Sequence, residues 1–233
     1  MHKRHLEKIN YIFYIPGCAG SLLSLLINSQ IQENFTFNGF IDDTAHNYKH
    51  DAIKNTHGYY DYIAYKKAGL SLKDHMEKNL YRETLTQRIV FYKWIEEFIK
   101  EKDLNLIICH MSDFNLKLLN FYKKLRGTPI LPPVDEDYDF KINKNHKHHD
   151  TIIYLKSLNW QCKFEEKYLD TVTTIKIDDI LGKKFDELNK ICKITNAQLL
   201  NEIVDQYNEK NKRDFNILPN SMKRYLKKYH NSI

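Results

Sequence analysis

The sequence predicts an α/β domain of three layers, in which helices flank a mostly parallel sheet. Short apolar runs rich in β-branched and aromatic residues alternate with longer segments of helical periodicity, the order typical of parallel sheets. No Gly/Ser-rich linker and no internal repeat divides the 233 residues. We therefore expect a single domain over residues 1–233 with a helical portion from 180 to 233, and the 42% hydrophobic content suffices for its core.

The N-terminal elements are expected to be a buried strand and a helix joined by a tight turn. Tyr11–Ile15 is short, β-branched and aromatic, and it stops at a Pro-Gly pair, as buried strands do. Ser21–Ser29 is Leu-rich and starts with a hydroxyl residue, which predicts a helix. Further on, 41–54 predicts a polar loop, 59–65 fits either a strand or a helix, and 72–102 predicts one or two long helices.

A second buried strand is expected at Leu104–Cys109, followed by a helix over Phe114–Leu125. The segment 128–150 is rich in Pro, His and charged residues and predicts an irregular surface region. The remaining expected elements are strands at 151–155 and 171–177, amphipathic helices at 180–191 and 197–210, and a basic helix at 222–229.

Composition narrows the class of protein. No apolar stretch reaches the roughly 18 residues of a membrane span without charges, and the apolar run before Cys18 is about half as long as a signal peptide needs. The four cysteines are scattered without a C-x-x-C pair, which argues against a zinc ribbon or disulfide framework and favours a cytoplasmic protein with reduced thiols. The net charge of +6 suits an anionic substrate or cofactor and, more weakly, nucleic acid.

The turn between the first expected strand and helix has the parts of a phosphate site. Gly17 and Gly20 let the backbone bend so that successive N–H groups point to one place. The start of the helix adds partial positive charge, and the Ser21 and Ser24 hydroxyls can donate to a phosphate oxygen. The Walker pattern is absent because the glycine spacing is too short and no lysine follows, so a standard ATPase or GTPase loop is not expected.

This turn resembles the loop that binds the 5′-phosphosulfate of the donor in the sulfotransferase family, a motif like P-K-x-G-G-T-S-x-L. The resemblance implies a P-loop NTPase/sulfotransferase-like fold, the donor 3′-phosphoadenosine 5′-phosphosulfate and no metal. The residues that it implies bind the donor are Pro16, Gly17, Cys18, Ala19, Gly20, Ser21 and Leu22. Gly17 stands where the family has its lysine, so that another cation takes its place or transfer is lost.

Two later segments look like parts of this family in outline. Residues 104–125 look like its mid-chain strand, polar turn and helix, and residues 171–195 look like its late strand, acidic turn and helix. For the family's serine and arginine that hold the 3′-phosphate of the donor, Ser112 and Arg126 are candidates by residue type. The family's adenine-contacting Arg-Lys-Gly segment is missing.

Transfer to a hydroxyl needs a base, and two histidines are candidates. His110 follows an expected buried strand, at the edge where parallel sheets bind ligands, and His46 lies in a polar loop with several acidic neighbours. The alternative for each is a surface or structurally satisfied histidine. The histidine-rich run within 143–150 is expected to be a solvated loop, because the adjacent His148 and His149 cannot easily share one metal ion.

The leading hypothesis is a sulfotransferase-like transferase that moves a sulfuryl group to an unknown hydroxyl acceptor by positioning and charge neutralisation, with His110 or His46 as base. The first alternative is a P-loop-like kinase or other nucleotide-binding protein, in which Asp113 would hold Mg²⁺. The second is a non-catalytic binding protein, for which Gly17 is the support. In that case the basic segment 210–228 contacts nucleic acid or is a solvated helix.

Overall fold

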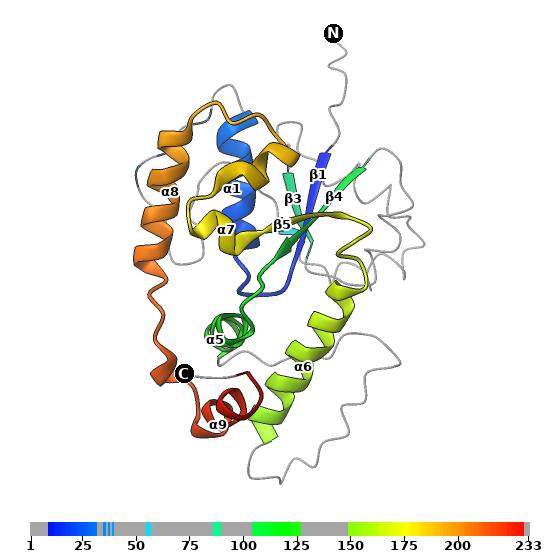
Figure 1. The fold of residues 1–233 in the computed structure, drawn as a ribbon, viewed down its shortest axis with the longest axis vertical. Helices are drawn as coiled ribbons and strands as arrows, with labels where there is room; N and C mark the ends of the chain where they lie inside the picture. Colours follow the sequence, from blue (N-terminus) through cyan, green and yellow to red (C-terminus); the bar gives the residue numbers. More distant parts are fainter. Residues whose placement is uncertain are drawn as a thin grey trace.

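The structure is a computed structural model that describes residues 9–31, 35, 37, 39, 55–56, 86–89, 104–126 and 149–230. Within these ranges one parallel sheet has the strand order β2-β3-β1-β4-β5 (Figure 1). Its strands are β1 (Ile9–Tyr14), β2 (Asn55–Thr56), β3 (Thr86–Ile89), β4 (Leu104–His110) and β5 (Thr173–Lys176). The predicted α/β class with a parallel sheet is thereby confirmed.

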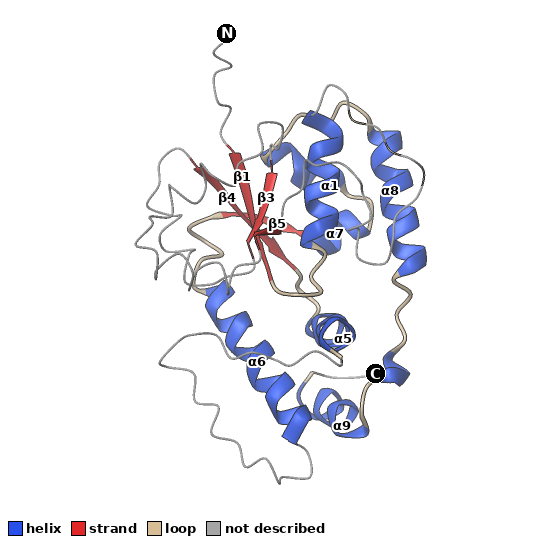
Figure 2. Ribbon diagram, turned by 180° about the vertical axis from the view of Figure 1, so that it is seen from behind, coloured by secondary structure: helices blue, strands red, loops and turns tan. Residues whose placement is uncertain are grey.

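Helices cover the sheet. They are α1 (Gly20–Ile31), α5 (Phe114–Leu125), α6 (His149–Glu166), α7 (Ile177–Leu181), α8 (Ala197–Lys210) and α9 (Asn220–Tyr229), with the 3₁₀ turns η1 (Phe185–Lys190) and η2 (Phe215–Ile217). Figures 1 and 2 show α1, α7 and α8 together on one side of the sheet, whereas α6 lies away from them and α5 lies beyond the end of β4. Among the described helices, none has the length and hydropathy needed to span a bilayer.

The central strand β1 packs both of its faces. Ile12 and Tyr14 join the main core with α1 and α8, while Phe13 between them is also fully buried and its ring lies 6.4 Å from that of Phe164 on α6. Because side chains alternate along a strand, helices on the two sides of the sheet account for both sets. This explains why the sequence of β1 is continuously apolar rather than alternating.

The strand expected at 151–155 is wrong, because these residues lie inside α6. Tyr154, Leu158 and Cys162 are buried at intervals of four residues, so a helical stripe 18 residues long outweighs the short β-branched run at its start. The same helix begins at His149, where the sequence predicted a loop.

Two helix predictions also need correction. The helices expected over 72–102 are wrong at Thr86–Ile89, which forms β3 because it pairs with β1 and β2, a non-local pairing that the local pattern does not reveal. The single helix expected at 180–191 is interrupted after α7, where Lys183 adopts a left-handed φ of 63°. Expectations for 41–54 and 59–65 fall outside the described residues.

The strand order fixes where a ligand can sit. After β1 the chain continues to β2 and β3 on one side of it, whereas after β4 it continues to β5 on the other. In open parallel sheets, ligands bind beyond the carboxyl ends of neighbouring strands whose connections diverge in this way. Here the switch point lies between β1 and β4, which are followed by the turns Pro16–Ala19 and Met111–Asp113.

Candidate functional site

The turn after β1 has the backbone of an anion-binding nest. Gly17 and Ala19 have positive φ values of 90° and 57°, and Cys18 between them does not. Such alternation turns successive N–H groups toward one side. The Cys18 N–H donates to the carbonyl of Ile15 at 2.9 Å, and the Leu23 N–H closes the first turn of α1 by donating to Ala19 at 3.0 Å. The backbone N–H groups of α1 that precede Leu23 therefore lie at the positive end of the helix.

Packing explains why both glycines of the turn are glycines. A Cβ at Gly17 would lie 2.7 Å from the carbonyl carbon of Asn120 on α5, and one at Gly20 would lie 2.1 Å from the ring of Tyr14. The turn is thus held between α5 on one side and the Tyr14 side chain of β1 on the other. The residue at the position of the sulfotransferase lysine cannot carry a side chain here without moving α5.

A histidine–carboxylate pair lies beside this turn. His110 is the last residue of β4, and its Nδ1 bonds to Oε1 of Glu165 in the last turn of α6. The Glu165 side chain is 1% exposed and the His110 side chain is 17% exposed. Among the residues that the structure describes, Oε2 of Glu165 has no hydrogen-bond partner. A carboxylate on Nδ1 orients the imidazole and leaves Nε2 for a proton transfer.

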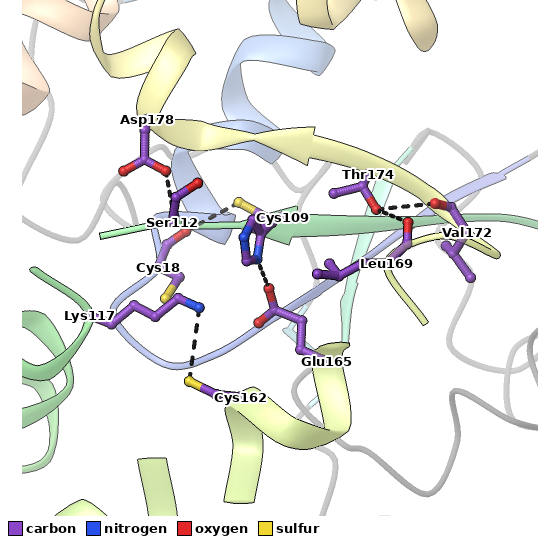
Figure 3. Close-up of polar contacts among 11 residues, drawn as sticks. Cys18, Cys109, Ser112, Lys117, Cys162, Glu165, Leu169, Val172, Thr174 and Asp178 are labelled. Atoms are coloured by element: carbon purple, nitrogen blue, oxygen red, sulfur yellow. Dashed lines mark hydrogen bonds and ion pairs between the residues drawn. The ribbon is translucent and has the colours of Figure 1, made fainter. Parts of the chain in front are cut away.

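A buried lysine lies close to the same pair. Lys117 on α5 is 6% exposed, and its Nζ is 3.9 Å from Sγ of Cys162, one turn before Glu165 on α6. Figure 3 shows Lys117 reaching from α5 toward Cys162, with Cys18 of the turn next to it. Among the described residues no carboxylate forms an ion pair with this ammonium. A thiol alone is a weak partner for a buried cation.

The thiols around the turn are held in their neutral form. Burial raises the pKa of Cys18 and of Cys109 well above the usual thiol value, and the negative charge of Glu165 raises both further. Burial likewise raises the pKa of Cys162 to about 11, although Lys117 opposes the shift. Protonated thiols are poor nucleophiles, so the burial of Cys18 does not favour a covalent role for its thiol. In the described ranges no set of three His, Cys, Asp or Glu side chains could hold a metal ion.

The turn after β4 is occupied by structural hydrogen bonds. The backbone N–H of the exposed Ser112 donates to Oδ2 of Asp178 at 2.6 Å, and the Asp113 carboxylate caps α5 by accepting from the Leu116 N–H at 3.0 Å. The charge of Asp178 opposes an anionic group at Ser112, so a role there in holding the 3′-phosphate of the donor gains no support. Arg126 lies at the opposite end of α5.

The structure brings the turn and His110 together at adjacent strands, as the sequence predicted for the carboxyl edge, while His46 lies outside the described residues. Ser21 is buried and Leu22 is fully buried, and the Leu22 side chain belongs to the core, which leaves only its backbone for a ligand.

Sequence reasoning missed Lys117 and Glu165. A charged residue within the apolar stripe of a helix is the sequence signal that could have identified them. For Glu165 this signal was hidden, because the first residues of its helix were predicted to be a strand.

Comparisons of the chain with protein-family models, with curated proteins and with solved structures gave no match.

Proposed function

We propose that this protein is a sulfotransferase-like enzyme with a P-loop-like fold, which takes a sulfuryl group from 3′-phosphoadenosine 5′-phosphosulfate and transfers it to a hydroxyl acceptor. One observation carries the proposal: a nest of backbone amides after β1 lies next to a carboxylate-oriented histidine at the end of β4. The first group suits an anionic donor, and the second suits removal of a proton from an acceptor.

The turn fits the phosphosulfate end of the donor. The positive end of α1 favours an anion, and the left-handed φ of Gly17 and Ala19 gives the turn the backbone of a nest. Lys117 supplies a cation from α5 where Gly17 cannot, because its ammonium is buried beside Cys18 without an ion-pair partner among the described carboxylates. The donor, when bound, supplies a sulfuryl group whose bond to the phosphate oxygen breaks. We assign no residue to its 3′-phosphate.

His110 is the proposed base. Its Nε2 accepts the proton of the acceptor hydroxyl as the acceptor oxygen bonds to sulfur, and Glu165 stabilises the resulting imidazolium. Lys117 and the N-terminus of α1 balance the negative charge left on the phosphate side. Oε2 of Glu165 has no hydrogen-bond partner among the described residues, so this carboxylate can accept a further hydrogen bond during the reaction.

The first test is a thermal-shift titration with 3′-phosphoadenosine 5′-phosphate, ATP and GTP, each with and without magnesium. A bisphosphate at about 100 times its Kd should stabilise the fold by about 2.7 kcal/mol, a rise in Tm of roughly 5–10 °C. Lys117→Met should reduce the shift, measured against the variant's own ligand-free Tm, while Lys124→Met at an exposed position of α5 should not.

A stabilisation seen only with ATP and magnesium would instead support the kinase alternative, and the absence of any shift would mean that the turn is structural. The second test measures transfer of labelled sulfuryl to a panel of phenols and sugars. His110→Ala should slow transfer by roughly 10²- to 10⁴-fold and leave bisphosphate binding intact. Bisphosphate binding without transfer to any acceptor would favour a binding protein that lacks the chemistry.

A further inference from the structure

We propose that the protein binds single-stranded nucleic acid on a second surface, formed by α9 and the turn that precedes η2. This basic surface consists of Lys212, Arg213, Arg224, Lys227, Lys228 and Tyr229. The inference rests on charge, exposure and ring contacts outside the site described above, and it stands independently of the proposed transfer reaction.

The net positive charge of the chain is concentrated in this segment. The segment 211–230 holds six Lys and Arg and one carboxylate, so it carries +5 of the formal net charge of +6. The one acid, Asp214, accepts a hydrogen bond from the Asn216 N–H at the start of η2. A basic stripe concentrated on one helix is the electrostatic footprint of a nucleic-acid partner.

The cations of this surface are exposed, and the one carboxylate of segment 211–230 is Asp214. Within the described part of the chain, none of them forms an ion pair. By contrast, Lys183 and Lys184 after α7 and Lys190 in η1 pair with Asp205, Asp179 and Glu187. Cations that carry no ion pair can bind phosphate groups, and each such contact releases counterions from a nucleic acid.

The surface is fixed to the domain. α9 buries Met222 and Leu226 against the core, and the Ser221 hydroxyl lies 2.7 Å from that of Thr151 at the start of α6. At the other end, the His230 ring stacks on Phe114 of α5 with centroids 4.0 Å apart. Figures 1 and 2 show α9 beside α5 and α6. The cations therefore form a preorganised surface rather than a tail.

An aromatic side chain stands among the cations. Tyr229 is 59% exposed, the Lys228 Nζ lies 5.0 Å from its ring centroid, and the Tyr225 ring lies 4.9 Å from it. Proteins that bind single strands combine cations along the backbone with aromatic rings on which bases stack. Because a base must be unstacked to lie on Tyr229, the surface fits a single strand better than a duplex. An anionic bilayer fits less well, since the apolar side of α9 is buried in the core.

The test measures fluorescence anisotropy of a labelled oligouridylate of about 20 nucleotides with the full chain over a series of salt concentrations. The variant Arg224→Gln/Lys227→Gln/Lys228→Gln should reduce the slope of log affinity against log salt by about 2, because a single strand contributes about 0.7 per phosphate contact. The control Lys183→Gln/Lys184→Gln/Lys190→Gln removes the same charge from paired lysines and should leave the slope nearly unchanged.

A second variant separates a nucleic acid from other polyanions. Tyr229→Leu should weaken oligouridylate binding by about 5- to 100-fold, the effect of losing one stacked base, and leave binding of a labelled heparin fragment unchanged. Equal losses in the two triple variants, an unchanged oligouridylate affinity in Tyr229→Leu, or no binding at low salt would each overturn the proposal. Circular dichroism melts of every variant establish that a lost signal does not come from unfolding.

Discussion

Replacing Gly17 by alanine tests the packing that holds the turn after β1 against α5. The new Cβ would lie 2.7 Å from the carbonyl carbon and 2.9 Å from the carbonyl oxygen of Asn120. These atoms belong to the backbone of a helix, so they cannot turn away as the end of a flexible side chain could. The substitution must either displace α5 or distort the turn.

Two costs add up at this position. A φ of +90° is strained for any residue with a Cβ, and this left-handed conformation costs about 1–2 kcal/mol. Overpacking against a rigid neighbour costs about 1–3 kcal/mol more. We therefore expect Gly17→Ala to lower the free energy of unfolding by about 3 kcal/mol, which in a chain of this size lowers Tm by roughly 6–12 °C.

The control is Gly39→Ala. Gly39 has a φ of +73° and is exposed, and a Cβ at this position would have no other atom within 4 Å, so the variant carries the backbone strain alone. The loss of unfolded-state freedom on replacing glycine is common to both variants and cancels in the comparison. The assay is urea unfolding followed by circular dichroism, with Tm measured in parallel.

A Gly17→Ala variant no less stable than Gly39→Ala would refute the reasoning, because it would mean that α5 does not press on the turn. The family lysine would then fit at this position, and the assignment of Lys117 as its replacement would lose its structural basis.

The other predictions concern the ring behind the turn, the buried thiols and the carboxylate of the site. Gly20→Ala should cost about 1–3 kcal/mol through the clash with the Tyr14 ring, and most of that cost should vanish in a Tyr14→Ala background when a double-mutant cycle is measured. The folded-state pKa of Cys162 is raised from 9.0 to about 11, so its contribution to stability is complete below pH 9 and lost as the pH rises toward 11. Urea unfolding across this range should show a decrease that Cys162→Ala reduces by up to about 2–3 kcal/mol, and equal pH slopes would contradict the shift. Glu165→Gln should lower sulfuryl transfer about tenfold or more and alter its pH–rate profile without changing bisphosphate affinity, and an unchanged rate would show that the carboxylate does not act through His110.

The local sequence pattern was sufficient to predict those helices, strands and turns whose conformation depends mainly on their own residues. The strand β1, the Pro-Gly turn and the start of α1 followed from an apolar run, two glycines and a Leu-rich segment. The helix α8 was predicted as an amphipathic helix, and α9 was predicted as a basic helix. His110 was found because a histidine directly after a buried strand lies at the ligand-binding edge whatever the strand's partners are.

Only the tertiary structure decided the other features of the fold and the site, because these features depend on contacts between residues far apart in the chain. Residues 86–89 became β3 through pairing with β1, and the reason for Gly17 is the backbone of Asn120 on α5. Glu165 meets His110 across 55 residues of sequence, from a helix whose first turns resemble a strand. Hydrophobic periodicity indicates which face of a helix or strand is buried, but it does not indicate which side chain of another element packs against that face. The pairing of His110 with Glu165 beside Lys117 joins different elements, so only the tertiary structure reveals it.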